Sequence, residues 1–478
     1  MADRPNILLI TTDQQRFDTI HALGNPHIHT PHLDWLADNG LSFTHCYSDT
    51  PVCMPARITL MTGQHGFHHQ VTGNISQPLP IDPRGSLPGL LTRAGYQTRA
   101  EGKMHFYPAR AHYGFEHMEI LEDYYREMAR HPQWGIPTDH GLGQNEMQPG
   151  ISTVDESHSL THWTVERSIN FIETRDPSRP FFLWTSFSKP HPPLDPCLSY
   201  WLMYQNSPLP EPVFGDWSQS LEKIPAGFRE PTYILNNADR FSPQLIGEVR
   251  RAYYALITQI DYNLGLLFAR LRELELLENT LILFTSDHGE MLGDHHLGAK
   301  SVFFEGSAHV PLILCPPGGF TGAERGSRCD RLACLADIYA TCLRAGEAHP
   351  PQDYSLDGID LQTLASGAVR RESLVGECDD RYMVLEERYK YTFCHTGGGE
   401  LLFDLQNDPY EQHNLAGDPA SAAVLEHLKA CLVEHVNRWH PEWVEGGRLA
   451  VFPESATAEI RNLWPGFHSR QRPDEVLH

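Results

Sequence analysis

The feature that most constrains the fold is a series of continuous apolar runs that alternate with segments of helical periodicity. Continuous apolar strands suit a sheet that is covered on both faces. Turn and helix signals bound each run. The expected strands are Asn6–Thr12, Leu41–Tyr47, Tyr96–Gly102, Pro180–Ser188, Thr280–Ser286 and Val310–Cys315.

The alternation of strands and helices predicts an α/β fold with a large, mostly parallel sheet flanked by helices. Pro31 follows Thr30 at a favourable helix start, and Gly40 follows Asn39 at a favourable stop. The expected helices are Thr30–Asn39, Pro55–Thr62, Leu87–Ala94, Ser159–Thr174, Pro243–Leu277 and Arg331–Ala345.

The pattern changes after about Gly358, where short strand-like runs with turns between them predict a small antiparallel sheet and then a helix over Ala420–Arg438. We therefore expect a catalytic α/β domain over residues 1–360, an α+β subdomain with the antiparallel sheet over 361–445, and an extended tail over 446–478. The runs are Glu372–Glu377, Tyr382–Glu387, Tyr389–Cys394 and Glu400–Leu405.

Two stretches rich in Pro, Gly, Trp and Tyr, residues 106–156 and 199–242, are predicted to be long irregular insertions. Insertions of this length in a compact domain are usually lids or pocket walls. We expect them, together with the tail, to form the specificity pocket.

Composition excludes several classes of function. The chain has 478 residues and a formal net charge of −24, which opposes binding to nucleic acid or anionic membranes. No stretch approaches the ~18 apolar residues of a membrane span. The N-terminus lacks a secretory pattern, and the ten cysteines are scattered without a CxxC pair. We expect a cytoplasmic protein with reduced thiols.

Two of the expected strands end in carboxylates. Asp13 and Gln14 follow the first strand, and Asp287 and His288 follow the strand Thr280–Ser286. In open α/β sheets, ligands sit at the carboxyl ends of strands. Two carboxylates that meet there need a counter-charge, and a divalent cation is the simplest one. The alternative is that each Asp only caps the helix that follows it.

The strongest local motif is Cys53-Met54-Pro55-Ala56-Arg57, which opens a predicted helix. A helix N-terminus favours anions. The plain alternative is a free cysteine before a helix with Pro near its start. A tyrosine-phosphatase loop is excluded, because it needs five residues between Cys and Arg and this chain has three.

Further cationic and imidazole side chains follow strand ends. An isolated His or Lys is most often a solvated surface group. Several that end successive strands describe instead a pocket for a tetrahedral anion. In this interpretation Arg57, Lys103 and Lys300 neutralise the anion, while His105 and His191 handle protons.

In these motifs the chain resembles the type I, formylglycine-dependent sulfatases of the alkaline phosphatase superfamily, close to arylsulfatases and phosphonate monoester hydrolases. Each motif alone is weak, but their order and spacing are specific. They are NILLITTDQQ, CMPARITLMTG, GKMHF, KPHPP, TSDHGEMLGDH, GAKSVFFEGSAHVPLI and ELLFDLQNDPYEQHNL.

The resemblance implies a sulfuric ester hydrolase that cleaves an aryl or small alkyl or sugar sulfate. A formylglycine-generating enzyme would oxidise Cys53 to Cα-formylglycine, because CxPxR is its recognition core. The hydrated aldehyde would attack sulfur and expel the alcohol. The second hydroxyl would then allow sulfate to leave by C–O cleavage, which a sulfated serine cannot do.

The resemblance also implies a metal site with Ca²⁺, or alternatively Mn²⁺ or Mg²⁺. Gln14 stands where many sulfatases have a second Asp, and it either coordinates through its amide oxygen or borders the metal. His288 stands where some sulfatases have Asn. The implied metal ligands are Asp13, Gln14, Cys53, Asp287 and His288.

The other implied roles concern substrate. Arg57 and Lys103 would hold the diol, His105 would take its proton, and His191 and Lys300 would bind sulfate and assist the leaving oxygen. Related hydrolases place a pocket amide at the position of Asn74. The implied substrate-binding residues are Asn74, Lys103, His191 and Lys300.

Two alternatives stay open. A phosphonate monoester hydrolase or phosphodiesterase would share the fold, the formylglycine and the metal ligands, although Lys103 and His105 favour a sulfatase because phosphonate hydrolases have uncharged residues there. A non-catalytic binding protein is opposed by the competent residue at every implied position. The Pro-rich tail predicts a homo-oligomer, either a dimer or a tetramer.

Overall fold

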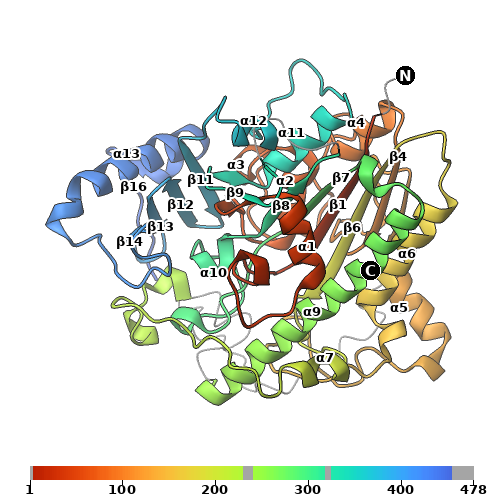
Figure 1. Ribbon diagram of the computed structural model, residues 1–478. Coiled ribbons are helices and arrows are strands. Elements are labelled where there is room, and N and C mark those ends of the chain that lie inside the picture. The colour runs from red at the N-terminus through yellow and green to blue at the C-terminus, as the bar shows by residue number, and fades with distance from the viewer. Residues whose placement is uncertain (1–3, 230–240, 318–323, 455–478) are drawn as a thin grey trace.

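The computed structural model describes residues 4–229, 241–317 and 324–454. An eight-stranded sheet runs through its larger part (Figure 1). Neighbouring strands are parallel except β8, which is antiparallel to both of its neighbours. In pairing order the strands are β5 (His117–Ile120), β4 (Gln97–Gly102), β6 (Phe181–Pro190), β1 (Asn6–Asp13), β7 (Thr280–Ser286), β8 (Leu312–Cys315), β2 (Leu41–Phe43) and β9 (Ser327–Cys329).

Helices cover both faces of this sheet, which explains why its central strands are apolar throughout. Alternate residues of β1 point to opposite faces. Leu8 and Ile10 pack with α1 (Pro31–Asn39), α6 (Leu160–Thr174) and α9 (Pro243–Glu273). The other face packs against α2 (Cys53–Thr62), α4 (Leu87–Arg93) and α11 (Ala336–Ala345).

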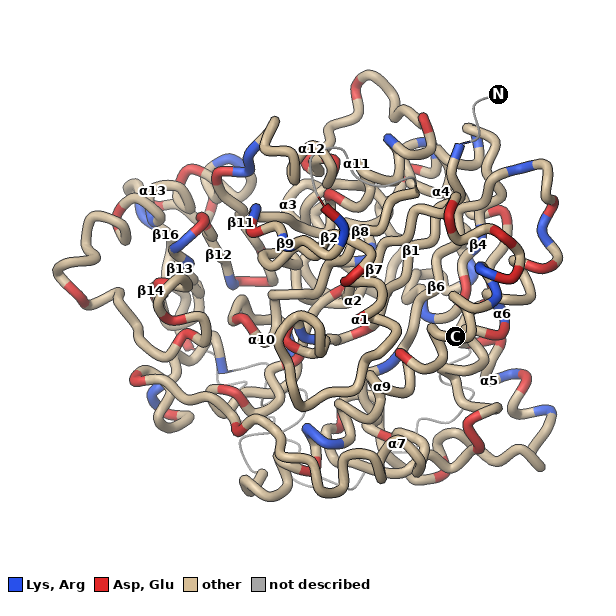
Figure 2. The backbone as a smooth tube through the Cα atoms, in the orientation of Figure 1, with Lys and Arg blue, Asp and Glu red and all other residues tan. Residues whose placement is uncertain are grey.

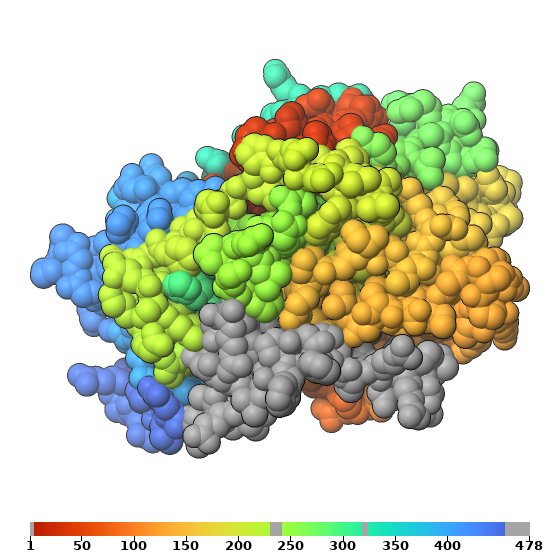
Figure 3. Space-filling model, turned by 90° about the horizontal axis from the view of Figure 1, so that it is seen from below, coloured from red at the N-terminus to blue at the C-terminus, as the bar shows by residue number. Residues whose placement is uncertain are grey.

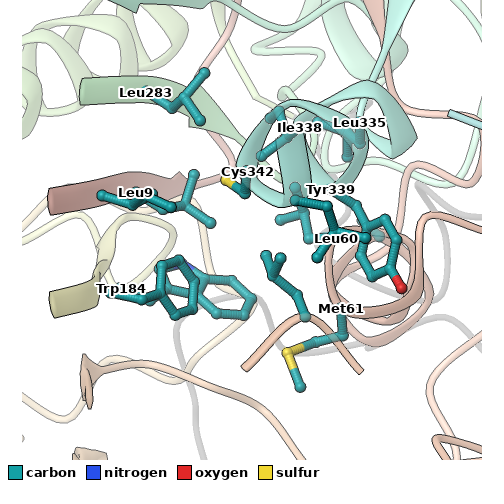
Figure 4. Close-up of a cluster of buried hydrophobic side chains, with 14 of the residues drawn as sticks. Leu9, Leu60, Met61, Trp184, Leu283, Leu335, Ile338, Tyr339 and Cys342 are labelled. Carbon is teal, nitrogen blue, oxygen red and sulfur yellow. The ribbon is translucent and has the colours of Figure 1, made fainter. Parts of the chain in front are cut away.

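Figure 4 shows the second of these cores. Leu9, Trp184 and Leu283 project from three adjacent strands, β1, β6 and β7, toward side chains of α2 and α11. Leu60 and Ile338 are fully buried there. This packing fixes α2, and with it the position of Cys53 at the first residue of that helix.

The C-terminal subdomain lies at one end of the molecule (Figure 1). Its four strands pair antiparallel in chain order, and α13 (Ala422–Trp439) packs on them. The buried Lys390 of this sheet forms ion pairs of 2.6 Å with Glu305 and with Glu411. The strands are β11 (Ser373–Cys378), β12 (Arg381–Glu386), β13 (Tyr389–Cys394) and β14 (Gly399–Asp404).

The predicted fold class is confirmed, but several predicted elements need correction. The strand predicted over Leu41–Tyr47 is divided into β2 and β3 (Cys46–Tyr47). The helix predicted from Arg331 begins only at Ala336, because β10 (Ala333–Cys334) pairs with β3 first. The first insertion is not irregular throughout, since it contains β5 and α5 (Leu121–Arg130).

The second insertion and the tail are partly described. The helix α7 (Leu198–Met203) opens the second insertion, whose residues 230–240 lie outside the described part, as do residues 455–478 of the tail. The strands β15 (Val444–Glu445) and β16 (Arg448–Leu449) pair with each other across residue 445, where the predicted subdomain ends and the predicted tail begins. On the face seen from below, the orange first insertion lies beside the yellow-green second one (Figure 3). Gly150 of the first insertion also donates a 2.8 Å backbone hydrogen bond to Leu194, which lies between β6 and the second insertion.

Charged residues are scattered over both parts of the molecule (Figure 2). Within the described ranges, no helix combines the length and apolar character that crossing a bilayer requires.

Candidate active site

Two adjacent parallel strands bring the first pair of candidate residues together. Thr12 of β1 is in register with Ser286 of β7, so that Asp13 and Asp287 emerge at the same edge of the sheet. The backbone N–H of Gln14 donates to Asp287 Oδ1 at 3.1 Å, which joins the two strand ends. Both carboxylates are fully buried.

Cys53 and His288 face this pair. The Sγ atom of Cys53 lies 3.3 Å from His288 Nε2 and 3.8 Å from Asp13 Oδ1. His288 Nδ1 lies 2.9 Å from the carbonyl oxygen of Gly289, which makes Nδ1 the protonated nitrogen. Nε2 therefore faces the centre of the cluster, where Asp287 and Cys53 raise the pKa of the imidazole against the effect of burial. A metal ion would bind Nε2 in place of a proton, as in a metal-binding imidazole.

These four residues fit a divalent cation. Their ligand atoms lie within 4.8 Å of one another, and all four residues are buried. Burial and the neighbouring charge of Asp13 raise the pKa of Asp287. Burial also opposes ionisation of Asp13, but the neighbouring charges, that of Lys103 above all, hold its pKa well below the usual value. Carboxylate oxygens with one imidazole suit Ca²⁺, Mg²⁺ or Mn²⁺.

Arg57 braces the two carboxylates from inside α2. It is fully buried, and its Nε and Nη2 atoms lie 3.0 and 2.9 Å from Asp287 Oδ2. Nη2 is 3.5 Å from Asp13 Oδ2, and Nη1 donates to Ser186 Oγ at 2.9 Å. Lys103 forms an ion pair with the same Asp13 oxygen. A guanidinium that bridges two carboxylates fixes their separation.

The surroundings of Cys53 are electropositive. Burial alone would raise the pKa of its thiol, but the charges of Lys300, Lys103 and His288 hold that pKa well below the usual value. The same field favours any anion at this position.

Lys300 and His191 form the opposite wall. Lys300 Nζ lies 2.9 Å from His191 Nε2 and 2.7 Å from Gln14 Oε1. Burial, with the charges of Lys300 and Lys103, lowers the pKa of His191 to about 4. At neutral pH this imidazole is therefore uncharged.

Three further predicted site residues, Asn74, His105 and Gln14, are not among the four clustered residues. Asn74 Oδ1 accepts a 3.1 Å hydrogen bond from the N–H of Met54, and thereby holds the start of α2. His105 is exposed, with a left-handed φ of 55°, and its side chain faces Cys53. The amide of Gln14 is engaged by Lys300 and by Glu290.

Sequence reasoning missed two residues that support the site. Ser186 lies inside β6 and accepts from Arg57, but no local pattern marks it. Glu290 is buried and bonds to Gln14, and its only signal was its place in the motif that contains Asp287 and His288.

A cavity of about 880 Å³ lies beside the cluster, and Lys103 connects the two, because it lines the cavity and forms an ion pair with Asp13. Lys103, His105 and His191 line it, together with residues of the first insertion such as Tyr125 and Leu142. The insertion is thus a pocket wall next to the candidate reaction centre.

Comparison with known proteins agrees with this geometry. The model of the Sulfatase family matches residues 5–347. An arylsulfatase of Clostridium perfringens (strain 13 / Type A) is 31% identical, over 96% of this chain and 100% of that protein. A choline-sulfatase of Rhizobium meliloti (strain 1021) is 31% identical, over 87% of this chain and 83% of that protein. The crystal structure of the phosphonate monoester hydrolase of Agrobacterium radiobacter superposes with a TM-score of 0.77 at 26% identity, covering 92% of this chain and 96% of that one.

The fold and the buried cluster together define a hydrolase of the alkaline phosphatase type. The chain belongs to the sulfatase family and is a sulfuric ester hydrolase, as its motifs predicted.

Proposed function

We propose that Cys53, matured to Cα-formylglycine by a formylglycine-generating enzyme, is the nucleophilic position and that one divalent ion assists it. Ca²⁺ is the proposed ion, with Mn²⁺ or Mg²⁺ as alternatives. The observation that carries the proposal is the convergence of Cys53, inside a CxPxR motif, on Asp13, Asp287 and His288. When present, the hydrated aldehyde supplies the attacking hydroxyl, and the ion supplies positive charge beside the reacting oxygens.

The chain's own residues prepare this chemistry. Arg57 keeps the two carboxylates apart and aimed at one point. Lys103 and Lys300 supply the positive charge that a sulfate group requires, and both are buried, where charge interactions are stronger than in water. His105, at the cavity, is the proposed acceptor of the nucleophile's proton.

The leaving oxygen is assigned to the opposite wall. His191 lines the cavity, and the buried Lys300 lies 2.9 Å from its Nε2 atom. Because His191 is neutral and accepts from Lys300, the ammonium is the group that holds the proton. We propose that this pair binds sulfate and protonates the departing alcohol.

The cavity and the relatives support a small organic sulfate as the substrate. A volume of about 880 Å³ admits an aryl or monosaccharide group beside the cluster. The relatives named arylsulfatase and choline-sulfatase match at least 83% of their own length. We propose an aryl or small alkyl or sugar sulfate ester.

The alternative substrate is a phosphonate monoester or phosphodiester, which the superposition on a phosphonate monoester hydrolase favours. Values of kcat/KM for aryl, choline and monosaccharide sulfates, measured beside a phenyl phosphonate ester, decide between them. The proposal expects the highest value for a sulfate ester, with Cys53→Ala as the inactive control. A large preference for the phosphonate would reverse the assignment.

The cytoplasmic localisation, the homo-oligomer and the division into domains at residues 360 and 445 stay predictions from the sequence. Size-exclusion chromatography with light scattering measures the oligomeric state directly.

A further inference from the structure

We propose that Glu290 is a positioning residue that orients the amide of Gln14 and, through it, the hydrogen bonds of Lys300. The kinetic part of its test rests on the proposed function, whereas the structural part does not. Glu290 lies in the loop after β7, and its side chain is buried.

The hydrogen bonds of Glu290 leave one orientation for Gln14. Glu290 Oε1 accepts from the backbone N–H groups of Leu292 at 3.1 Å and Ala299 at 2.5 Å. Its other oxygen, Oε2, accepts from Gln14 Nε2. A carboxylate only accepts hydrogen bonds, so Gln14 must present its nitrogen to Glu290 and turn its oxygen away.

The oxygen of Gln14 then faces the reaction centre. Lys300 Nζ donates to it at 2.7 Å and to His191 Nε2 at 2.9 Å. His191 Nδ1 in turn lies 2.8 Å from the carbonyl oxygen of Pro192. Each donor in this chain has an acceptor. The carboxylate of Glu290 only accepts and the ammonium of Lys300 only donates, so both ends require the same orientation of the Gln14 amide. This orientation also suits the predicted role of Gln14 as a metal ligand, because a hard cation binds the oxygen of a side-chain amide and not its nitrogen.

The backbone around Gln14 and Glu290 is held independently of this contact. The hydroxyl of Tyr253 donates to the carbonyl of Gln14 at 2.6 Å and accepts from the N–H of Arg16 at 2.9 Å. The guanidinium of Arg16 donates to the carbonyl of Glu290 at 3.0 Å. A change confined to the side chain of Glu290 therefore leaves the loop frame in place.

Glu290→Gln is the direct perturbation. The oxygen of the new amide is still required by the N–H groups of Leu292 and Ala299, so its nitrogen must face Gln14. Gln14 then turns its oxygen to residue 290 and its nitrogen to Lys300, which sets two donors against each other. Loss of a hydrogen bond to a charged group predicts a fall in kcat/KM of about 10- to 100-fold.

The exchange Gln14→Glu with Glu290→Gln is the matched rescue. It keeps the net charge and restores a donor facing an acceptor at each step, because the new amide at position 290 donates to the new carboxylate at position 14, which in turn accepts from Lys300. We expect the exchange variant to recover most of the kcat/KM that Glu290→Gln loses. Gln14→Glu alone places two carboxylates in contact, and its kcat/KM should stay below that of the exchange variant. Glu377→Gln, a buried change in β11, is the control and leaves kcat/KM within about twofold.

Crystal structures of the variants give the readout that needs no turnover. In Glu290→Gln, Lys300 Nζ should leave the side chain of residue 14, and in the exchange variant it should return to near the original 2.7 Å. A folded Glu290→Gln that keeps this contact, or an exchange variant no better than Glu290→Gln, overturns the proposal. If the parent enzyme cleaves no sulfate ester, the proposed function fails and the structures alone decide the role of Glu290.

Discussion

Replacement of Arg57 by Ala tests how the two central carboxylates are held. The guanidinium lies 2.9 and 3.0 Å from Asp287 and 3.5 Å from Asp13, and all three side chains are buried. Removing one partner of a buried ion pair costs about 3–5 kcal/mol, because the remaining charge is left unpaired. In the presence of a chelator we therefore expect the free energy of unfolding to fall by about that amount.

A divalent ion should offset part of this loss. The ion pairs the same carboxylates, and it binds more tightly once the positive charge of Arg57 no longer competes with it. A ligand at one hundred times its Kd stabilises the folded state by about 2.7 kcal/mol. Urea titrations with a chelator and with Ca²⁺ measure both effects, and Ca²⁺ should stabilise Arg57→Ala more than the parent.

Arg371→Ala is the matched control. Arg371 also forms a buried ion pair, 2.6 Å from Asp337, which is not among the candidate site residues. Its replacement should cost a similar amount, and the cost should not depend on Ca²⁺. A loss below about 1 kcal/mol for Arg57→Ala, or the same Ca²⁺ response in both variants, would refute the reasoning.

Other outcomes follow from the same structure. Cys53→Ser should bind substrate but lose multiple turnover, with a sulfated protein seen by mass spectrometry. Steady turnover by this variant would contradict elimination from a diol. Ile338→Ala should cost about 2–5 kcal/mol in urea titrations, because the side chain is fully buried beneath the sheet. Burial lowers the pKa of His435 from 6.5 to about 4. The unfolded chain therefore takes up this proton at a higher pH than the folded chain does, and stability should fall as the pH drops from about 6.5 to 4. His435→Phe should show a smaller drop in Tm between pH 7.5 and 5.

The central strands and the candidate residues at their ends could be predicted because their signals are local. The apolar runs of β1 and β7 stop at the points where Asp13 and Asp287 begin the loops. Parallel pairing then brings these two residues together without any further information.

Other features depend on tertiary contacts that no local pattern records. The strand β5 has four residues, which is too short for a period to be recognised, and it forms by pairing with β4. Gln14, which bonds to Glu290, has a left-handed φ of 73°, a conformation that is uncommon for a residue other than Gly. The sequence shows both residues but not their contact.

The most direct test of the central claim is mass spectrometry of the peptide that contains Cys53, taken from protein that turns over a sulfate ester. The proposal predicts an aldehyde, present with its hydrate, in place of the thiol side chain. Active protein in which residue 53 is an unmodified cysteine would contradict it.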